Sequence, residues 1–174
     1  CPVGFKNGTD GNIKIAVDAI KAASQPHHFL SVTKKGHTAI VLTKGNTDCH
    51  IILRGGKLPN YDKKSVDSAC IQIEKNNLSP LLMIDASHAN SLKKPENQKL
   101  VCQDISTQIS DGDKRIIGIM IESNLQAGRQ DLVPGEKLIY GKSITDGCIN
   151  WKDSVSNLEV IAQAVNKRRK KNKL

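Results

Sequence analysis

Residues 81–90 read LLMIDASHAN, an apolar run that gives way to polar residues at Asp85. A short continuous apolar run bounded by turn residues is typical of a strand that is buried on both faces of a parallel sheet. Behind it, apolar residues recur at the spacing of one helix face, at Val101, Cys102, Ile105 and Ile109. The stretch therefore predicts a strand, a loop and a helix, the repeating unit of an α/β fold.

Three further units follow the same pattern. Apolar strands are predicted at residues 3–5, 49–53 and 116–121. The helices that follow them have apolar faces built from Ile13, Val17 and Ile20, from Val66, Ala69, Cys70 and Ile73, and from Val155, Leu158, Ile161, Ala162 and Val165. After the first helix, the runs 29–33 and 37–43 are joined by Lys34-Lys35-Gly36 and predict a β-hairpin. The chain thus predicts a parallel sheet covered by helices, with an inserted hairpin.

Composition limits the classes of function. The chain has 174 residues, of which 38% are hydrophobic, which suffices for one domain with its own core. Its apolar runs are far shorter than the roughly 20 residues that span a bilayer, so we expect no membrane helix. The net charge is +9, but six cations lie in the basic tail, residues 166–174. A basic tail on a near-neutral body with 3% aromatics makes nucleic acid an unexpected partner, although a polyanion-binding tail remains an alternative.

The five cysteines are widely spaced and include no CxxC pair. This pattern favours neither a disulfide framework nor a zinc knuckle, so we expect a protein of the reducing cytoplasm. The chain opens with CPVGF, without an initiator Met or a signal sequence. We therefore expect it to begin inside a longer protein.

Polar residues follow the predicted strands at their C-terminal ends: Lys6, Arg54, His88 and Glu122. Those ends share one face of a parallel sheet, where barrels and doubly wound sheets have their sites. With Asp146, His88 and Glu122 offer one imidazole and two carboxylates, which suit a divalent metal such as Mn, Fe, Co or Zn. The alternative for each residue alone is a hydrogen-bonded histidine or a solvated loop acid.

Two cations and two glycines lie on the same predicted face. Lys6 and Arg54 could bind an anion, and Gly55 and Gly56 would let backbone N–H groups approach it closely. A phosphorylated or carboxylated substrate would fit. The alternative is a surface lysine and a glycine pair that only turns the chain.

Five ordered runs, CPVGFKNGTDG, CHIILRGG, MIDASHAN, IGIMIES and YGKSITDGCINW, resemble the C-terminal half of type I 3-deoxy-D-arabino-heptulosonate 7-phosphate synthases. The resemblance implies a (β/α)8 TIM barrel. Residues 1–165 would form about half of it, from strand five onward, with a regulatory hairpin at residues 29–43 inserted after helix five.

The resemblance also implies an activity, that of a metal-dependent transferase. The family condenses phosphoenolpyruvate with erythrose 4-phosphate, giving 3-deoxy-D-arabino-heptulosonate 7-phosphate and phosphate, the first step of the shikimate pathway to aromatic amino acids. By motif, Lys6 and Arg54 would hold phosphoenolpyruvate, and His88, Glu122 and Asp146 would bind the metal that orients the aldehyde. Asp146 would also lie near the aldehyde sugar, so the catalytic set is Lys6, Arg54, His88 and Asp146.

Part of the family's site precedes strand five and is absent here. The missing groups are a cysteine metal ligand and several cations that grip both substrates. Cys1 and Cys49 stand in other motifs, and we expect both to be small buried side chains. We therefore expect this segment alone to be inactive. The related 3-deoxy-D-manno-octulosonate 8-phosphate synthase remains an alternative, although the hairpin and GKSITDGCINW favour the heptulosonate enzyme.

Catalysis at the C-terminal ends of the strands gives no reason to insert residues 29–43 between helix five and strand six, so we expect the hairpin to serve a contact of its own. Side chains alternate along strands, which allows Phe29, Ser31 and Val41 to share one face. By resemblance, these positions belong to the pocket for an aromatic amino acid that causes feedback inhibition, and Ser31 favours phenylalanine. The alternative is that the three residues pack a subunit interface. We expect a homo-oligomer.

Overall fold

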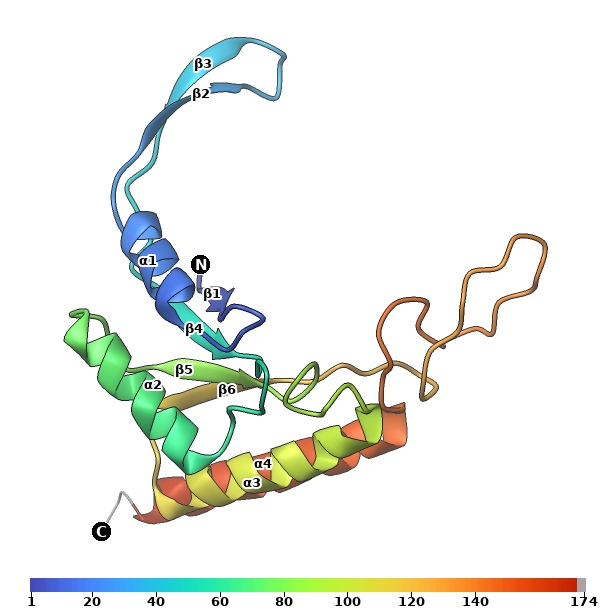
Figure 1. Cartoon of the computed structure of the whole chain (residues 1–174). Coiled ribbons are helices and arrows are strands. Elements are labelled where there is room, and N and C mark those ends of the chain that lie inside the picture. The colour runs from blue at the N-terminus through green and yellow to red at the C-terminus, as the bar shows by residue number, and fades with distance from the viewer. Residues whose placement is uncertain (172–174) are drawn as a thin grey trace.

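The computed structural model describes residues 1–171. Four parallel strands form one sheet in which spatial order follows chain order (Figure 1). They are β1 (Val3–Lys6), β4 (Cys49–Leu53), β5 (Leu82–Asp85) and β6 (Ile116–Met120). Since each strand is parallel to its neighbour, all four C-terminal ends lie at one edge of the sheet.

Helices connect the strands and cover one face of the sheet (Figure 1). α2 begins where the Asp62 carboxylate accepts from the Ser65 N–H, and α3 ends at Gly112, whose φ of 114° suits only glycine well. The long pair α3 and α4 lie side by side. The helices are α1 (Lys14–Ala23), α2 (Lys63–Lys75), α3 (Gln98–Asp111), which the short 3-10 helix η1 (Pro95–Asn97) precedes, and α4 (Trp151–Lys171).

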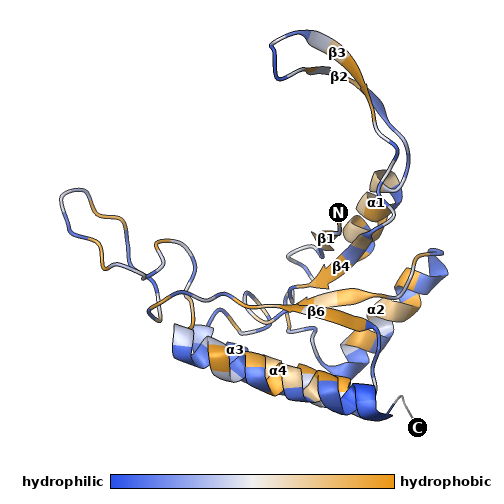
Figure 2. Ribbon diagram, turned by 180° about the vertical axis from the view of Figure 1, so that it is seen from behind, coloured by the Kyte–Doolittle hydropathy of each residue, from blue (hydrophilic) through white to orange (hydrophobic). Residues whose placement is uncertain are grey.

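The core lies between the sheet and the helices. Alternate strand residues point into it, among them Ile51, Leu53, Leu82, Ile84 and Ile116. Figure 2 shows that apolar residues gather on β4 and β6 and on the helices, whereas the C-terminal end of α4 is hydrophilic. The α/β prediction is therefore confirmed. No helix within residues 1–171 is long and apolar enough to cross a membrane.

The opposite face of the sheet has its own close packing. His50 Nε2 lies 3.0 Å from Met83 Sδ, and a Cβ at Gly118 would lie 2.9 Å from Met83 Cε. Glycine on β6 therefore makes room for the Met83 side chain. Burial lowers the pKa of His50, because a charged imidazole is poorly solvated there.

The predicted apolar face of the last helix is wrong in part. Ser154, Asn157 and Ala164 are the buried residues of α4, whereas Leu158 is 55% exposed. The Ser154 hydroxyl is buried against Ser123 Oγ and the Asn150 carbonyl, so this position is held by hydrogen bonds rather than by an apolar side chain. The helix also continues through residues 166–171 of the sequence-defined tail, where Arg168 donates to the Asp113 carbonyl. Residues 172–174 of that tail lie outside the described residues.

The inserted hairpin is present. β2 (His28–Val32) pairs antiparallel with β3 (Thr38–Leu42), and both project away from the sheet and helices (Figure 1). Phe29 lies opposite Val41, and Ser31 lies opposite Ala39. Since directly opposed residues share a face, Phe29, Ser31 and Val41 lie on the same side of the hairpin, as predicted.

Candidate metal centre and substrate cavity

The predicted site residues lie around the C-terminal edge of the sheet. Lys6 is the last residue of β1, Arg54 follows β4 directly, His88 follows β5, and Glu122 follows β6. Asp146 comes from the long loop between β6 and α4. Segments far apart in the sequence thus meet at one edge because the sheet is parallel.

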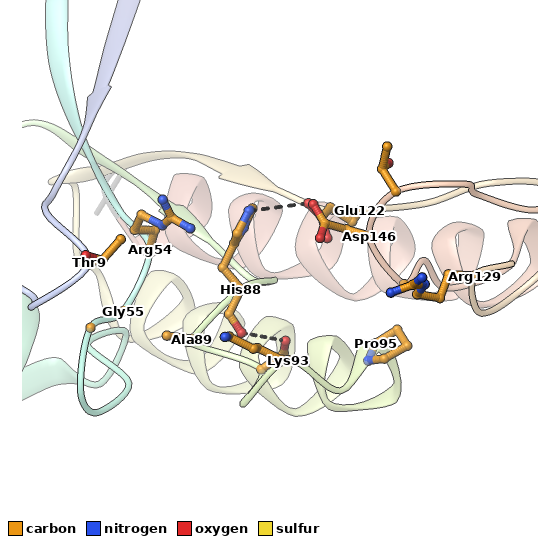
Figure 3. Close-up of a pocket in the computed structure, with 14 residues that line it drawn as sticks. Thr9, Arg54, Gly55, His88, Ala89, Lys93, Pro95, Glu122, Arg129 and Asp146 are labelled. Carbon is orange, nitrogen blue, oxygen red and sulfur yellow. Dashed lines mark hydrogen bonds and ion pairs between the residues drawn. The ribbon is translucent and has the colours of Figure 1, made fainter. Parts of the chain in front are cut away.

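Three of these side chains form a compact cluster. Potential ligand atoms of His88, Glu122 and Asp146 all lie within 4.8 Å of one another. His88 Nε2 is 3.6 Å from Glu122 Oε1, and the two side chains are about one quarter exposed. Figure 3 shows the imidazole pointing toward both carboxylates. His88 has a φ of 52°, a left-handed conformation that is uncommon for residues other than glycine and often marks functional sites.

This donor set fits a divalent metal. A neutral imidazole nitrogen and two carboxylate oxygens are ligands that Mn, Fe, Co and Zn accept in proteins. Burial raises the pKa of Glu122 and the nearby Asp146 carboxylate adds to the rise, while the charge of His88 opposes it. Two carboxylates that approach this closely repel each other, and a cation between them would relieve the repulsion.

Asp85, the last residue of β5, lies directly beneath the cluster. Its side chain is fully buried and accepts from Lys6 Nζ at 2.7 Å, from the Ser87 N–H at 2.9 Å and from Ser87 Oγ at 2.5 Å. His88 Nδ1 lies 2.9 Å from Asp85 Oδ2. Burial alone would raise the pKa of Asp85, but the hydrogen bonds from Lys6 and Ser87 outweigh it and hold the pKa below its ordinary value. Asp85 is thus an ionised buried carboxylate.

Gln98 holds the backbone at Glu122. Its side chain is fully buried, its Nε2 donates to the Glu122 carbonyl at 3.0 Å, and its Oε1 accepts the Glu122 N–H at 2.9 Å. The amide thereby takes the place of a neighbouring strand just beyond the end of β6. Sequence reasoning missed both Gln98 and Asp85. A charged residue at the end of an apolar strand, three positions before His88, was a usable signal for Asp85, whereas nothing local marked Gln98.

A cavity of about 590 Å³ opens over the cluster. Its lining includes His88, Glu122 and Asp146, with Arg54 on one side and Arg129 on the other (Figure 3). Lys6 is not among its lining residues; it reaches the site from beneath, through the ion pair with Asp85. The cavity therefore combines a metal-type donor set with cations at two sides, which suits anionic substrates.

The predicted use of Gly55 and Gly56 as anion-binding N–H groups is wrong. The Gly55 N–H donates to Asn60 Oδ1 at 2.7 Å and the Gly56 N–H donates to the Leu58 carbonyl at 2.9 Å, so both are engaged within their own loop. The glycines serve close packing instead. A Cβ at Gly55 would lie 2.7 Å from Ala89 Cβ, and its φ of 76° is left-handed.

Buried asparagines join the loops that carry the cations. Asn7 donates to the Gly55 carbonyl and accepts the Arg54 N–H, which fastens the end of β1 to the loop after β4. Asn90 in turn accepts the Asn60 N–H and donates to the Leu53 carbonyl. These bonds fix the backbone around Arg54 relative to the loop of His88.

All five cysteines are free, and none belongs to the metal-type cluster. Cys49 is half-buried, but Cys1 is exposed, so the expectation of a buried Cys1 is wrong. Cys1 precedes β1 and is therefore not covered by the sheet. Burial raises the pKa of the Cys102 thiol to about 11, which keeps it protonated at neutral pH.

A sequence model of the DAHP synthetase I family matches residues 1–159. The chain belongs to this family. Over 169 residues it is 59% identical to the Phe-sensitive phospho-2-dehydro-3-deoxyheptonate aldolase of Escherichia coli strain K12. Over 171 residues it is 57% identical to the phospho-2-dehydro-3-deoxyheptonate aldolase of Haemophilus influenzae. These alignments cover 97% and 98% of this chain but 48% and 47% of the relatives, so the chain spans about half the length of the curated relatives it matches.

This chain also covers about half the length of a protein whose structure has been solved. Phospho-2-dehydro-3-deoxyheptonate aldolase from Francisella tularensis SCHU S4 superposes with a TM-score of 0.91 at 47% sequence identity, covering 97% of this chain and 49% of that one. The predicted family and the predicted fold, about half of a TIM barrel, are both confirmed.

Proposed function

We propose that the protein containing this chain condenses phosphoenolpyruvate with erythrose 4-phosphate and water, giving 3-deoxy-D-arabino-heptulosonate 7-phosphate and phosphate. The observation that supports this most strongly is the cluster of His88, Glu122 and Asp146 in a cavity flanked by Arg54, within a member of this family. The relatives named above are phospho-2-dehydro-3-deoxyheptonate aldolases, and this name describes the proposed reaction.

The cluster would hold one divalent metal, with His88 supplying Nε2 and Glu122 and Asp146 each supplying a carboxylate oxygen. When bound, such an ion would orient the aldehyde of the sugar phosphate and polarise its oxygen. Asp146 is the most exposed of the three residues, so an incoming aldehyde would meet the cluster first at this side chain.

Arg54 and Lys6 would bind phosphoenolpyruvate. A guanidinium matches phosphate or carboxylate oxygens in a bidentate manner, and Arg54 lines the cavity beside His88. The Lys6 ammonium uses one N–H on Asp85, which leaves two donors for an anion. Together they would neutralise the substrate's charge while its carbon three joins the aldehyde carbon.

The proposal is tested by phosphate release from the intact protein. Release should require phosphoenolpyruvate, erythrose 4-phosphate and a divalent metal together, should stop on chelation, and should return on adding Mn²⁺. Release that is unaffected by chelation, or that does not need the aldehyde, would contradict it.

Two alternatives are less favoured. An octulosonate synthase forms an eight-carbon product, so it needs a five-carbon aldehyde phosphate; a preference for arabinose 5-phosphate over erythrose 4-phosphate would support it. The names of the relatives point the other way. A polyanion-binding tail would have some of its cations engaged, because Arg168 donates to the Asp113 carbonyl and Lys171 Nζ lies 3.9 Å from Asp111 Oδ1; salt-dependent DNA binding that is lost with the tail would support it.

We further propose that the hairpin binds an aromatic inhibitor, with phenylalanine favoured. Phe29, Ser31 and Val41 share a face that offers apolar walls and one hydroxyl, which suits an aromatic ring with a polar backbone. The relative from Escherichia coli is named Phe-sensitive. Since the hairpin projects from the body of this chain, a second subunit would complete the pocket, which supports a homo-oligomer. The five free cysteines support a cytoplasmic location.

A further inference from the structure

The carboxylate of Asp85 is fully buried, and burying such a group is costly unless it is well paired. Its carboxylate is well paired, because Oδ1 accepts twice from Ser87 and Oδ2 faces both Lys6 and His88. Buried ion pairs contribute little net stability compared with apolar packing. Stability alone therefore gives no reason to place a carboxylate here, at the end of an otherwise apolar strand.

The contact with His88 selects one form of the imidazole. Nδ1 is hydrogen-bonded to Ser87 Oγ at 2.7 Å, and because the Ser87 hydroxyl donates its own hydrogen to Asp85 Oδ1, Oγ accepts from Nδ1. Asp85 Oδ2 lies 2.9 Å from the same Nδ1, where its charge favours an N–H at that nitrogen. An Nδ1 that carries the proton leaves the Nε2 lone pair free, and Nε2 is the atom that faces Glu122. Asp85 thus favours the tautomer that a metal ligand needs.

The contact with Lys6 crosses the sheet. Lys6 ends β1 and Asp85 ends β5, and β4 lies between these two strands. The 2.7 Å ion pair therefore bends the lysine over the end of β4 and places its ammonium beside the metal-type cluster. Without this partner, a side chain with four rotatable bonds would have no fixed direction.

We propose that Asp85 is a positioning residue that fixes His88 and Lys6 through one carboxylate, so that the metal-binding and phosphoenolpyruvate-binding parts of the site are held together. The inference rests on the proposed function. Its consequence is a double loss: removing the charge of Asp85 weakens both metal and phosphoenolpyruvate binding, whereas removing Lys6 weakens phosphoenolpyruvate binding alone.

The test compares three variants of the intact protein with the parent. Asp85→Asn keeps the shape of the side chain but loses the charge, and Lys6→Ala removes one partner. Asp113→Asn is the control, because the Asp113 side chain is 8% exposed, pairs with Arg115 and does not line the cavity. Mn²⁺ binding is read from the electron paramagnetic resonance signal of the free ion. Phosphoenolpyruvate binding is read by calorimetry at saturating Mn²⁺.

We expect Asp85→Asn to weaken Mn²⁺ binding by about 10- to 100-fold, the usual effect of losing the partner of a metal-bound histidine, and to weaken phosphoenolpyruvate binding as well. Asp113→Asn should bind both ligands like the parent although it is less stable. Parent-like binding of both ligands by Asp85→Asn would overturn the inference. A parent that binds no Mn²⁺ would instead overturn the proposed function, and this inference with it.

A second variant covers the case in which Asp85→Asn does not fold. Ser87→Ala removes the hydroxyl that donates to Asp85 and faces His88 Nδ1, while the ion pair with Lys6 remains. We expect weaker Mn²⁺ binding with the melting temperature close to that of the parent. Unchanged Mn²⁺ binding in a folded Ser87→Ala protein would contradict the positioning role.

Discussion

Gln98→Met should destabilise the protein and loosen its metal site at the same time. Methionine has about the volume of glutamine but makes neither of the two hydrogen bonds to the Glu122 backbone. Losing these bonds leaves the Glu122 N–H unpaired, whereas the Glu122 carbonyl still accepts from the Ile149 N–H, so we expect the free energy of unfolding to fall by about 1–2 kcal/mol. The backbone of Glu122 would then be held less firmly beside His88.

Urea denaturation of the intact protein measures the first effect, and Mn²⁺ titration measures the second. The midpoint should fall with an unchanged m-value, since the surface exposed on unfolding stays the same. Gln103→Met is the matched control, because Gln103 lies on the same helix and is exposed. If Gln98→Met and Gln103→Met unfold at the same midpoint and bind Mn²⁺ equally well, the role assigned to Gln98 is wrong.

Three further predictions concern the site, the hairpin and the fold. His88→Ala should abolish both Mn²⁺ binding and turnover. Lys6→Ala should keep the metal but lose phosphoenolpyruvate affinity or rate. Full metal occupancy in the His88 variant, with metal loss in the Lys6 variant, would show that the two roles are reversed. Ser31→Phe should fill the hairpin pocket and relieve inhibition with little change in uninhibited turnover, and equal titrations of phenylalanine, tyrosine and tryptophan against variant and parent would remove the hairpin from regulation. Hydrogen bonds from Arg115 hold the pKa of Asp113 below its ordinary value of 3.8 against the opposing effect of burial. Asp113→Asn should therefore cost about 2 kcal/mol of unfolding free energy at pH 7, and the difference should shrink as the pH falls below 3.8 and through the lowered pKa, because protonation removes the ion pair from the parent. A difference that stays constant down to pH 2 would exclude this ion pair as its source.

The strands and the shared edge could be predicted because a parallel sheet leaves a local signal. Each buried strand is a continuous apolar run, and His88 and Glu122 follow two of them within three residues. Asp146 has no such anchor. It lies in a long loop, so it was grouped with the other two by its residue type, and the family's SITDGC motif supports its role as a metal ligand.

The sequence did not show which hydrogen bonds the polar groups make in the folded protein. Gln98 looks like an ordinary first residue of a helix, and only the fold reveals that its amide pairs with the backbone beside Glu122. Likewise, the N–H groups of Gly55 and Gly56 look free in a sequence, although Asn60 and Leu58 already engage them. Neither the bond between Gln98 and Glu122, which lie 24 residues apart, nor the bonds within the loop of Gly55 and Gly56 follow a period that could be detected along the sequence.

The prediction of the apolar face of α4 was wrong in part for a related reason. Leu158 suggested a core position by its hydrophobicity, but it is 55% exposed, whereas Ser154 and Ala164 are buried. Hydrophobic spacing predicts that a helix is amphipathic more reliably than it predicts which residues meet a helix packed at close range.

The most direct test of the account is to locate a metal in crystals of the intact protein soaked in Zn²⁺, using anomalous scattering. The account predicts one strong peak at about 2.0–2.2 Å from His88 Nε2 and from a carboxylate oxygen of both Glu122 and Asp146, with His88 Nδ1 still facing Asp85. A peak that lies elsewhere, or a Zn²⁺ bound through His88 Nδ1, would contradict it.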